Sequence, residues 1–229
     1  MRLLTSLFFA STLLLTVAPM QAADSPAKTR VLIITGDDVS AHDWLTCAVA
    51  TREVLQASGQ FSVEVTGGAE VLANGDNLKN VDVVYFLMYN AKTPMLSDAG
   101  KANLLGFVKG GKGFVVAHLA SASFKDWPEF RALCGRVWVM GNSGHGLRSV
   151  FKAKVVDAAS PIMQGIKDFD QDDELYGKLQ GDAPIHVLMQ AESDWSKQVE
   201  PLAFTLDYGQ GRVFHRMFPG PNSGFPLFF

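Results

Sequence analysis

The sequence has little cysteine, no excess of basic charge and only one long apolar run. Its 229 residues include 2 cysteines, and 20 Lys and Arg are set against 23 Asp and Glu, so the formal net charge is −3. This balance argues against a nucleic-acid-binding surface, and the 48% hydrophobic content argues against a disordered chain. The length fits one domain with a full hydrophobic core.

The two cysteines, Cys47 and Cys134, could form a disulfide if the protein enters an oxidising compartment. However, Cys47 lies in a helical pattern, and Cys134 lies at a helix end followed by glycine. Small buried apolar residues are common at such positions. We therefore expect two free thiols.

The one long apolar run stands at the start of the chain. A charged Met1-Arg2 precedes an apolar run over residues 3–17, and small residues follow up to Ala23. This order is typical of a signal peptide over residues 1–23, cut near Ala22 or Ala23. The run is shorter than the roughly 20 residues that a spanning helix needs, so no membrane span is expected after cleavage. The sequence thus predicts a periplasmic or secreted protein, with a short linker over residues 24–29 and one domain over residues 30–229.

The rest of the chain alternates between apolar strand patterns and helical patterns. Strands are predicted over residues 31–34, 61–65, 81–88 and 114–117, and helices over 44–58, 97–109 and 127–133. Short connections between them indicate an α/β fold with a doubly wound, mainly parallel sheet. Further strands are predicted over 150–156, 185–189, 202–206 and 212–214, and the last two form a hairpin around Gly209 and Gly211.

Polar side chains follow the first, third and fourth predicted strands. In an open α/β sheet, ligands bind outside the carboxyl ends of the strands, so these residues are expected to share one site. His118 gives the sharpest signal, because it follows a buried strand and has a side chain that titrates near neutral pH. The group comprises Asp37, Asp38, His42, Asp43, Trp44, Tyr89, Asn90 and His118.

Each candidate also has a structural alternative. His118 could be a hydrogen-bonded core histidine, and His42-Asp43 could simply cap the following helix. His145 lies between glycines that would let a ligand approach the backbone. His186 and His215 lie within strand patterns and are expected to be structural.

Several familiar motifs are absent or misplaced. Residues 110–113, Gly-Gly-Lys-Gly, precede a strand and do not begin a helix, so they are expected to form a turn and not a phosphate loop. There is no Gly-x-Ser-x-Gly elbow, no dinucleotide fingerprint and no short-spaced metal-ligand pair. We therefore predict no cofactor, with a divalent metal held by histidines as the minority alternative.

Five short motifs, taken in order, resemble the ThuA-like (trehalose-utilisation) family over about residues 30–218. The resemblance implies a flavodoxin-like fold of the class I glutamine amidotransferase type, with an antiparallel C-terminal extension. It places His118 at the elbow where those enzymes carry their cysteine, so glutaminase chemistry is not expected. The motifs are Ile34-Thr35-Gly36 with His42-Asp43-Trp44, Gly111 to His118, Gly144-His145-Gly146, Asp173-Glu174-Leu175-Tyr176, and Tyr208 to Phe214.

The resemblance also implies a role in carbohydrate use and a set of site residues. The catalytic candidates are His118, His42, His145 and Glu174, and the candidates for substrate binding are Asp43, Trp44 and Asn90. Near its end the chain departs from the family: Leu-Gly-His-Asp and a helix are expected, but Met217 to Asn222 follow instead. This atypical or truncated C-terminus removes one expected site histidine.

Three functions remain open from the sequence. The first is acid/base chemistry on a trehalose-like disaccharide or keto-sugar, as in an isomerase or hydrolase. The second is a non-catalytic periplasmic sugar-binding module. The third is a metal-dependent hydrolase that uses the same histidines. The expected partner is a small-molecule carbohydrate, with no nucleic acid, and a homo-oligomer is left open.

Overall fold

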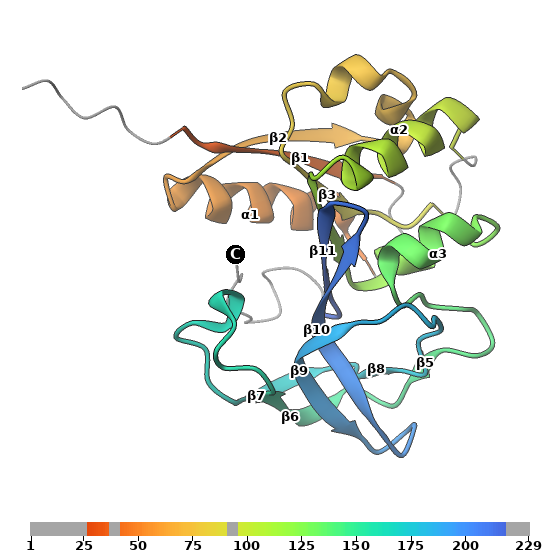
Figure 1. The fold of residues 1–229 in the computed structure, drawn as a ribbon. Helices are drawn as coiled ribbons and strands as arrows, with labels where there is room; N and C mark the ends of the chain where they lie inside the picture. Colours follow the sequence, from red (N-terminus) through yellow and green to blue (C-terminus); the bar gives the residue numbers. More distant parts are fainter. Residues whose placement is uncertain (1–26, 37–41, 91–95, 219–229) are drawn as a thin grey trace, which may run out of the picture.

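A nine-stranded twisted sheet runs through the whole molecule (Figure 1). The computed structural model describes residues 27–36, 42–90 and 96–218. The strand order is β2-β1-β3-β4-β11-β10-β9-β6-β7. The first five strands are parallel and the remaining pairings are antiparallel. The observed order therefore confirms an α/β fold with a flavodoxin-like parallel half and an antiparallel C-terminal extension.

The parallel half is built from short, β-branched and apolar strands. β1 (Thr29–Thr35) pairs with β2 (Phe61–Gly67) on one side and with β3 (Val83–Leu87) on the other. β4 (Gly113–Ala117) follows β3, and β11 (Gly211–Arg216) returns from the end of the chain to pair with β4. Both faces of the central strands β1, β3 and β4 are covered, which explains their apolar runs, whereas the edge strand β2 alternates partly buried and exposed residues.

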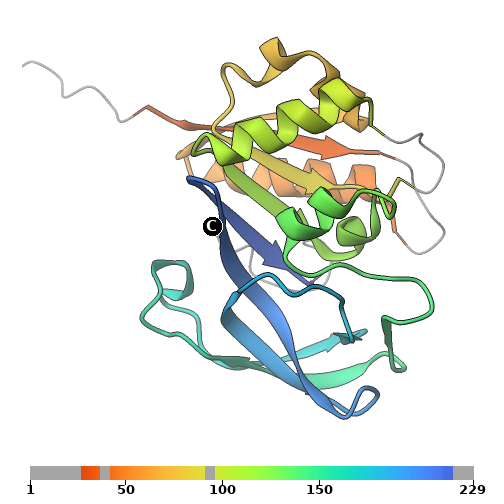
Figure 2. The ribbon, with the colours of Figure 1, turned by 45° about the vertical axis from the view of Figure 1, so that its right-hand side comes forward.

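Helices cover the two faces of this half. α1 (Trp44–Ala57) packs with Ile33 and Tyr85 on one face, while α2 (Asp98–Lys109) and α3 (Pro128–Cys134) pack on the other (Figure 2). Ser97 caps α2 by accepting a hydrogen bond from Gly100 N at 3.1 Å. The 3₁₀ turns are η1 (Ala69–Ala73), η2 (Gly75–Leu78), η3 (His118–Ala122) and η4 (Pro161–Met163).

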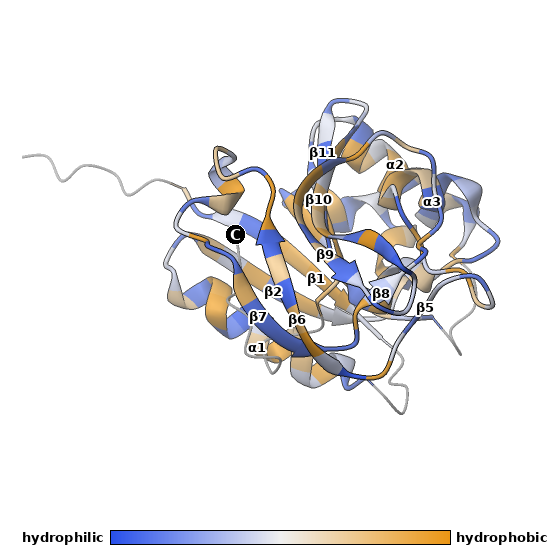
Figure 3. Cartoon of the chain, turned by 90° about the horizontal axis from the view of Figure 1, so that it is seen from below, coloured by the Kyte–Doolittle hydropathy of each residue, from blue (hydrophilic) through white to orange (hydrophobic). Residues whose placement is uncertain are grey.

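One long strand connects the antiparallel half of the sheet to the parallel half. β10 (Gln198–Tyr208) pairs with β11 and β9 (His186–Ser193), and β6 (Ser149–Val155) and β7 (Phe169–Asp173) extend the sheet to its edge. A separate two-residue ladder joins β5 (Gly144–His145) to β8 (Tyr176–Gly177). Figure 3 shows the edge strand β7 as largely hydrophilic, in contrast to the apolar strands of the parallel half.

Most predicted elements occur within two or three residues of their predicted ends, although β10 extends further at its start. β7 was not predicted, because its sequence Phe-Asp-Gln-Asp-Asp lacks an apolar face. The predicted hairpin over 202–214 is confirmed by the β10–β11 pairing. Cys47 and Cys134 are free thiols, as expected. The predicted signal peptide and the tail after Phe218 lie outside the described residues, among which no helix is long and apolar enough to cross a membrane.

Candidate active site

His118 stands at a sharp elbow between strand β4 and the turn η3. Its φ is +52°, a left-handed backbone conformation that non-glycine residues adopt rarely and at a cost. The strain is held by buried surroundings, since every residue of η3 is buried. The elbow predicted from the family resemblance is therefore present, with an imidazole at its apex.

Both ring nitrogens of His118 have partners. Nδ1 lies 2.6 Å from the carbonyl oxygen of Met217, which can only accept, so this nitrogen carries a proton. Nε2 is then the acceptor for the Tyr176 hydroxyl at 2.7 Å. Burial, with a smaller effect of His42, lowers the pKa of His118 to about 3. His118 is thus a neutral imidazole at physiological pH, and it orients the Tyr176 hydroxyl.

Four aromatic rings from separate segments form one continuous row beside this elbow. The His118 ring centroid lies 4.9 Å from that of His42 and 4.2 Å from that of Tyr176. Tyr176 in turn stacks on His145 at 5.8 Å. Trp138 closes one side, 4.5 Å from Tyr176. The structure therefore brings together three predicted histidines, as the strand-end argument required for His42 and His118.

The β5–β8 ladder fixes the far end of the row. His145 and Tyr176 face each other directly in its register. Gly144 allows the ladder to approach the turn after β9, because a Cβ there would lie 2.7 Å from the Trp195 ring. The glycine-rich loop predicted from the sequence therefore serves close packing, and it presents His145 at the edge of the site.

His145 is held between two acceptors. Its Nδ1 lies 2.7 Å from the carbonyl oxygen of Gly146, and its Nε2 lies 3.4 Å from a carboxylate oxygen of Glu174. At least one of these ring nitrogens carries a proton and can donate it in a hydrogen bond to the facing oxygen. The pair is partly exposed, so a ligand can reach it. His145 is therefore a hydrogen-bonding group at the edge of the site.

His42 has the opposite character. Burial lowers its pKa, and the charge of Glu174 opposes this in part. Its ring stacks on Trp44 at 5.1 Å, and its buried Nδ1 has no hydrogen-bond partner among the described residues. A half-buried imidazole whose pKa is lowered is suited to accept a proton from a ligand.

The predicted substrate-binding residues make contacts that support the local fold. Both carboxylate oxygens of Asp43 accept from Thr46, the backbone N at 2.9 Å and the hydroxyl at 2.6 Å, so Asp43 caps α1. Asn90 Oδ1 accepts from Phe124 N at 2.8 Å and holds that residue at a φ of +51°. Trp44 is buried against His42. Direct roles for these three in substrate binding stay predictions.

The remaining histidines lie outside the row. His215 is fully buried on the α3 side, where its Nδ1 donates to Cys134 O at 3.0 Å, and burial lowers its pKa to about 4. It therefore does not replace the missing family histidine. His186 lies on the surface and faces Asp157 at 2.8 Å. The two cysteines lie on helices, Cys47 on α1 and Cys134 on α3.

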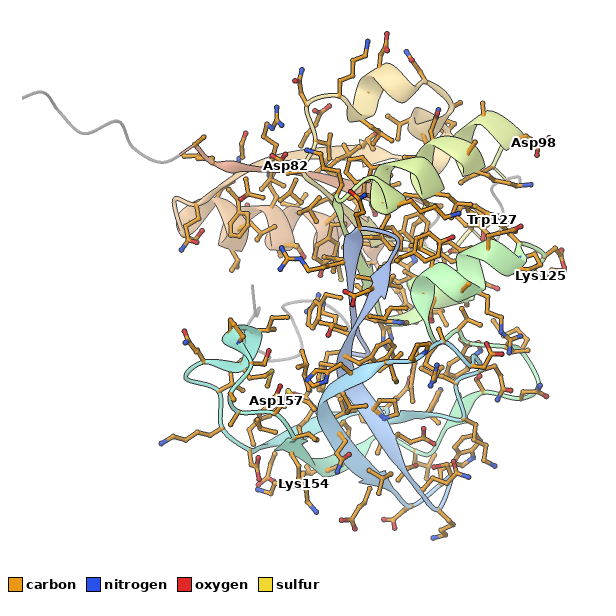
Figure 4. The ribbon with its side chains drawn as sticks, viewed as in Figure 1. Asp82, Asp98, Lys125, Trp127, Lys154 and Asp157 are labelled. Carbon is orange, nitrogen blue, oxygen red and sulfur yellow. The ribbon has the colours of Figure 1, made fainter. Side chains whose placement is uncertain are left out.

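A cavity of about 550 Å³ adjoins the row through the shared Trp138 and the turn η3. Its walls combine aromatic side chains with polar and aliphatic ones, and Trp127 and Lys125, which line it, are labelled beside α3 in Figure 4. Phe124, the residue held at positive φ by Asn90, forms part of the same wall. Asn90 thus shapes this cavity through Phe124. The space exceeds that of one sugar ring, and aromatic faces are typical contacts for sugars.

The described residues contain no group of three or more His, Cys, Asp or Glu that could hold a metal ion. Neither ring nitrogen of His118 is open to a metal, because the contacts with Met217 and Tyr176 use both. The metal-dependent alternative therefore requires these contacts to break first.

Tyr176 is the main site residue that the sequence argument missed. The sequence indicates Tyr176 only as the last residue of the motif Asp173-Glu174-Leu175-Tyr176, because a two-residue strand produces no periodic pattern. Its hydroxyl is 2.7 Å from His118, and burial raises its pKa well above the usual range, with Glu174 adding to the effect. The signal that could have found it is the pairing of the two glycine-flanked segments around His145 and Tyr176.

Comparisons with known proteins identify the family and support the fold. The family model for trehalose utilisation, ThuA, matches residues 30–218. A protein described as ThuA-like from Parabacteroides merdae has a TM-score of 0.71 at 24% identity, over 83% of this chain and 79% of that one. A second, from Bacteroides uniformis, has a TM-score of 0.68 at 16% identity, over 92% of this chain and 90% of that one.

More distant structures share the fold alone. A β-galactosidase from Rahnella has a TM-score of 0.58 at 16% identity, over 86% of this chain but only 30% of the enzyme. No curated protein matches the chain significantly. The family match supports a carbohydrate-related role at the level of the family.

Proposed function

Because the chain belongs to the ThuA (trehalose-utilisation) family, we propose that its row of rings performs proton transfer on a keto-sugar or a disaccharide. The observation that carries the proposal is the row itself, in which the half-buried His42 and the partly exposed His145 lie on either side of the His118–Tyr176 pair. Burial lowers the pKa of His42, which suits it to be a neutral base. Two imidazoles in one site, one to accept a proton and one to donate a proton, meet the requirements of isomerisation or hydrolysis at a carbonyl-bearing sugar.

Each residue then has a distinct task. His42 accepts a proton from the sugar, and His145, held by Glu174, donates one to the developing oxyanion. His118 is too weak a base to ionise in its buried position, so it positions Tyr176. The Tyr176 hydroxyl and the nearby Trp138 ring hold the sugar, while the adjoining cavity accepts the rest of a disaccharide. No cofactor takes part in these steps.

Turnover of keto-glycosides by purified variants tests the proposal. His42→Gln and His145→Gln should each lower kcat by about 10² or more, with smaller changes in KM, because general acid–base catalysis contributes this much. His186→Gln is the matched control, since that ring is exposed on another part of the molecule. Equal rates in His42→Gln and wild type would contradict the assignment of the base.

A non-catalytic sugar-binding module remains the second candidate, favoured by the departure of residues 217–222 from the family pattern. Calorimetry separates the two functions. Tight binding of a glucoside without any turnover by wild type would favour the module, and turnover would exclude it.

We further propose that the protein is exported. The support is the charged, apolar and small-residue order of residues 1–23. Sequencing of the protein recovered from a periplasmic fraction should give a first residue near Asp24. An intact Met1 in a cytoplasmic fraction would contradict export.

A further inference from the structure

Arg216 is a buried cation at the edge of the candidate active site. It is the last residue of β11 and lies opposite Ala117 of β4, the residue before His118. Its side chain is on the same face of the sheet as Tyr85, with the guanidinium carbon 5.8 Å from the Tyr85 ring centroid. Only 5% of Arg216 is exposed.

The guanidinium lacks an anionic partner among the described residues. Its Nε and Nη2 are fully buried without a hydrogen-bond partner there, and it takes part in none of their ion pairs. The acids of the candidate site have other partners: Asp43 caps α1, and Glu174 faces His145. By contrast, Arg30 and Arg148 lie on the surface and pair with Asp82 and Asp172.

An unpaired buried charge is costly. Removing a guanidinium from water is costly, and its contact with an aromatic ring offsets only part of that cost. The charge acts on the site, because it contributes to the lowered pKa of His118. A buried cation in register with the residue before the elbow is best explained by a ligand that arrives with the opposite charge.

We propose that Arg216 is an anion-binding group and that the carbohydrate taken by this site carries a carboxylate or a phosphate. This inference rests on the function proposed above and narrows its substrate class from neutral sugars to sugar acids or sugar phosphates. The planar guanidinium offers parallel N–H donors to two oxygens of either anion. Its position beside Ala117 brings the bound anion next to the His118–Tyr176 pair.

The test measures binding, so it does not depend on turnover. Wild type, Arg216→Met and Arg212→Met are titrated by calorimetry with D-gluconate, D-glucose 6-phosphate and D-glucose. Arg212 is the matched control, because it lies on the same strand and is exposed. We expect wild type to bind one of the two anions at least tenfold more tightly than glucose, with a preference that weakens as salt is added. The better anion distinguishes a carboxylate from a phosphate ligand.

The two variants show whether Arg216 is responsible for the anion preference. Arg216→Met should remove the anion preference, and Arg212→Met should retain it. Without ligand, Arg216→Met should unfold at the same temperature as wild type or higher, because methionine removes an unpaired charge and keeps most of the volume.

Two results would overturn the inference. One is a wild type that binds glucose as tightly as both anions. The other is a ligand-free Arg216→Met protein that unfolds several degrees lower while still preferring anions, which would show that the guanidinium supports the fold. Neither result affects the proposed catalysis, which is judged by the loss of kcat in the His42→Gln and His145→Gln variants. Conversely, anion binding without turnover would retain the role of Arg216 and remove the catalysis.

Discussion

Lowering the pH from 7.5 to 4.5 should destabilise the protein through two histidines that are buried in their neutral form. In the folded chain the pKa is about 3 for His118 and about 4 for His215, against an ordinary value of 6.5 for histidine. Below pH 6.5 the unfolded chain therefore binds protons that the folded chain does not. The stability that these rings contribute is present above pH 6.5 and is lost as the pH falls toward the folded pKa values.

The size of the loss follows from the width of this window. One pKa unit corresponds to 1.36 kcal/mol, and two units separate pH 6.5 from pH 4.5. Each ring thus costs about 2.5 kcal/mol, and the two together cost about 5 kcal/mol. Whole domains have unfolding free energies of about 5–15 kcal/mol, so the protein should approach its unfolding midpoint in mild acid. His42, whose pKa is also lowered, acts in the same direction.

Urea unfolding followed by circular dichroism between pH 4.5 and 7.5 measures how the unfolding free energy depends on pH. The slope of that dependence gives the number of protons taken up on unfolding. His118→Asn and His215→Asn should each reduce it by close to one proton, because asparagine can still donate to Met217 O or Cys134 O without titrating. His186→Asn is the control and should leave the slope nearly unchanged, since that ring is exposed. A wild-type slope below one proton would show that water reaches both rings and would refute the neutral assignment of His118.

Three further predictions concern single positions. Asp43→Ala should lower the unfolding free energy by about 1 kcal/mol in urea, because Thr46 N loses its cap; no change would mean that water replaces the carboxylate without cost. Tyr176→Phe should cost about 1–3 kcal/mol in the same assay, because it leaves the buried Nε2 of His118 without a donor while retaining the ring, and a stability equal to wild type would argue against the 2.7 Å hydrogen bond. Lys197→Gly should raise the melting temperature slightly by relieving a φ of +58°, and a lower melting temperature would show that the lysine side chain contributes more than the strain costs.

The parallel half of the fold could be predicted because its physics is local. A strand buried on both faces must be apolar throughout, so Val31 to Ile34 and Phe114 to Ala117 were recognisable from composition. The edge strand Phe169–Asp173 was missed because its exposed face is acidic and only Gln171 is well buried. Local patterns identify a buried strand better than an edge strand.

The proximity of His42 and His118 could be predicted from strand ends, whereas the proximity of Tyr176, which depends on long-range pairing, could not. His42 and His118 follow strands whose carboxyl ends meet, so their proximity followed from topology. Tyr176 is brought to His118 by a two-residue ladder, and so short a pairing produces no periodic pattern in the sequence. Arg216 was missed because the last strand was predicted to stop at Phe214, two residues early.

The segments that carry the row of rings differ in how firmly the rest of the structure holds them. His118 is anchored by the main sheet, whereas His145 and Tyr176 are presented by the short β5–β8 ladder. A local opening of that ladder would separate His145 and Tyr176 from the elbow and expose the His118 imidazole, while the parallel sheet stayed folded. The proposed chemistry would then be lost without a change in the main sheet, and a spectroscopic check of folding alone would not reveal that loss.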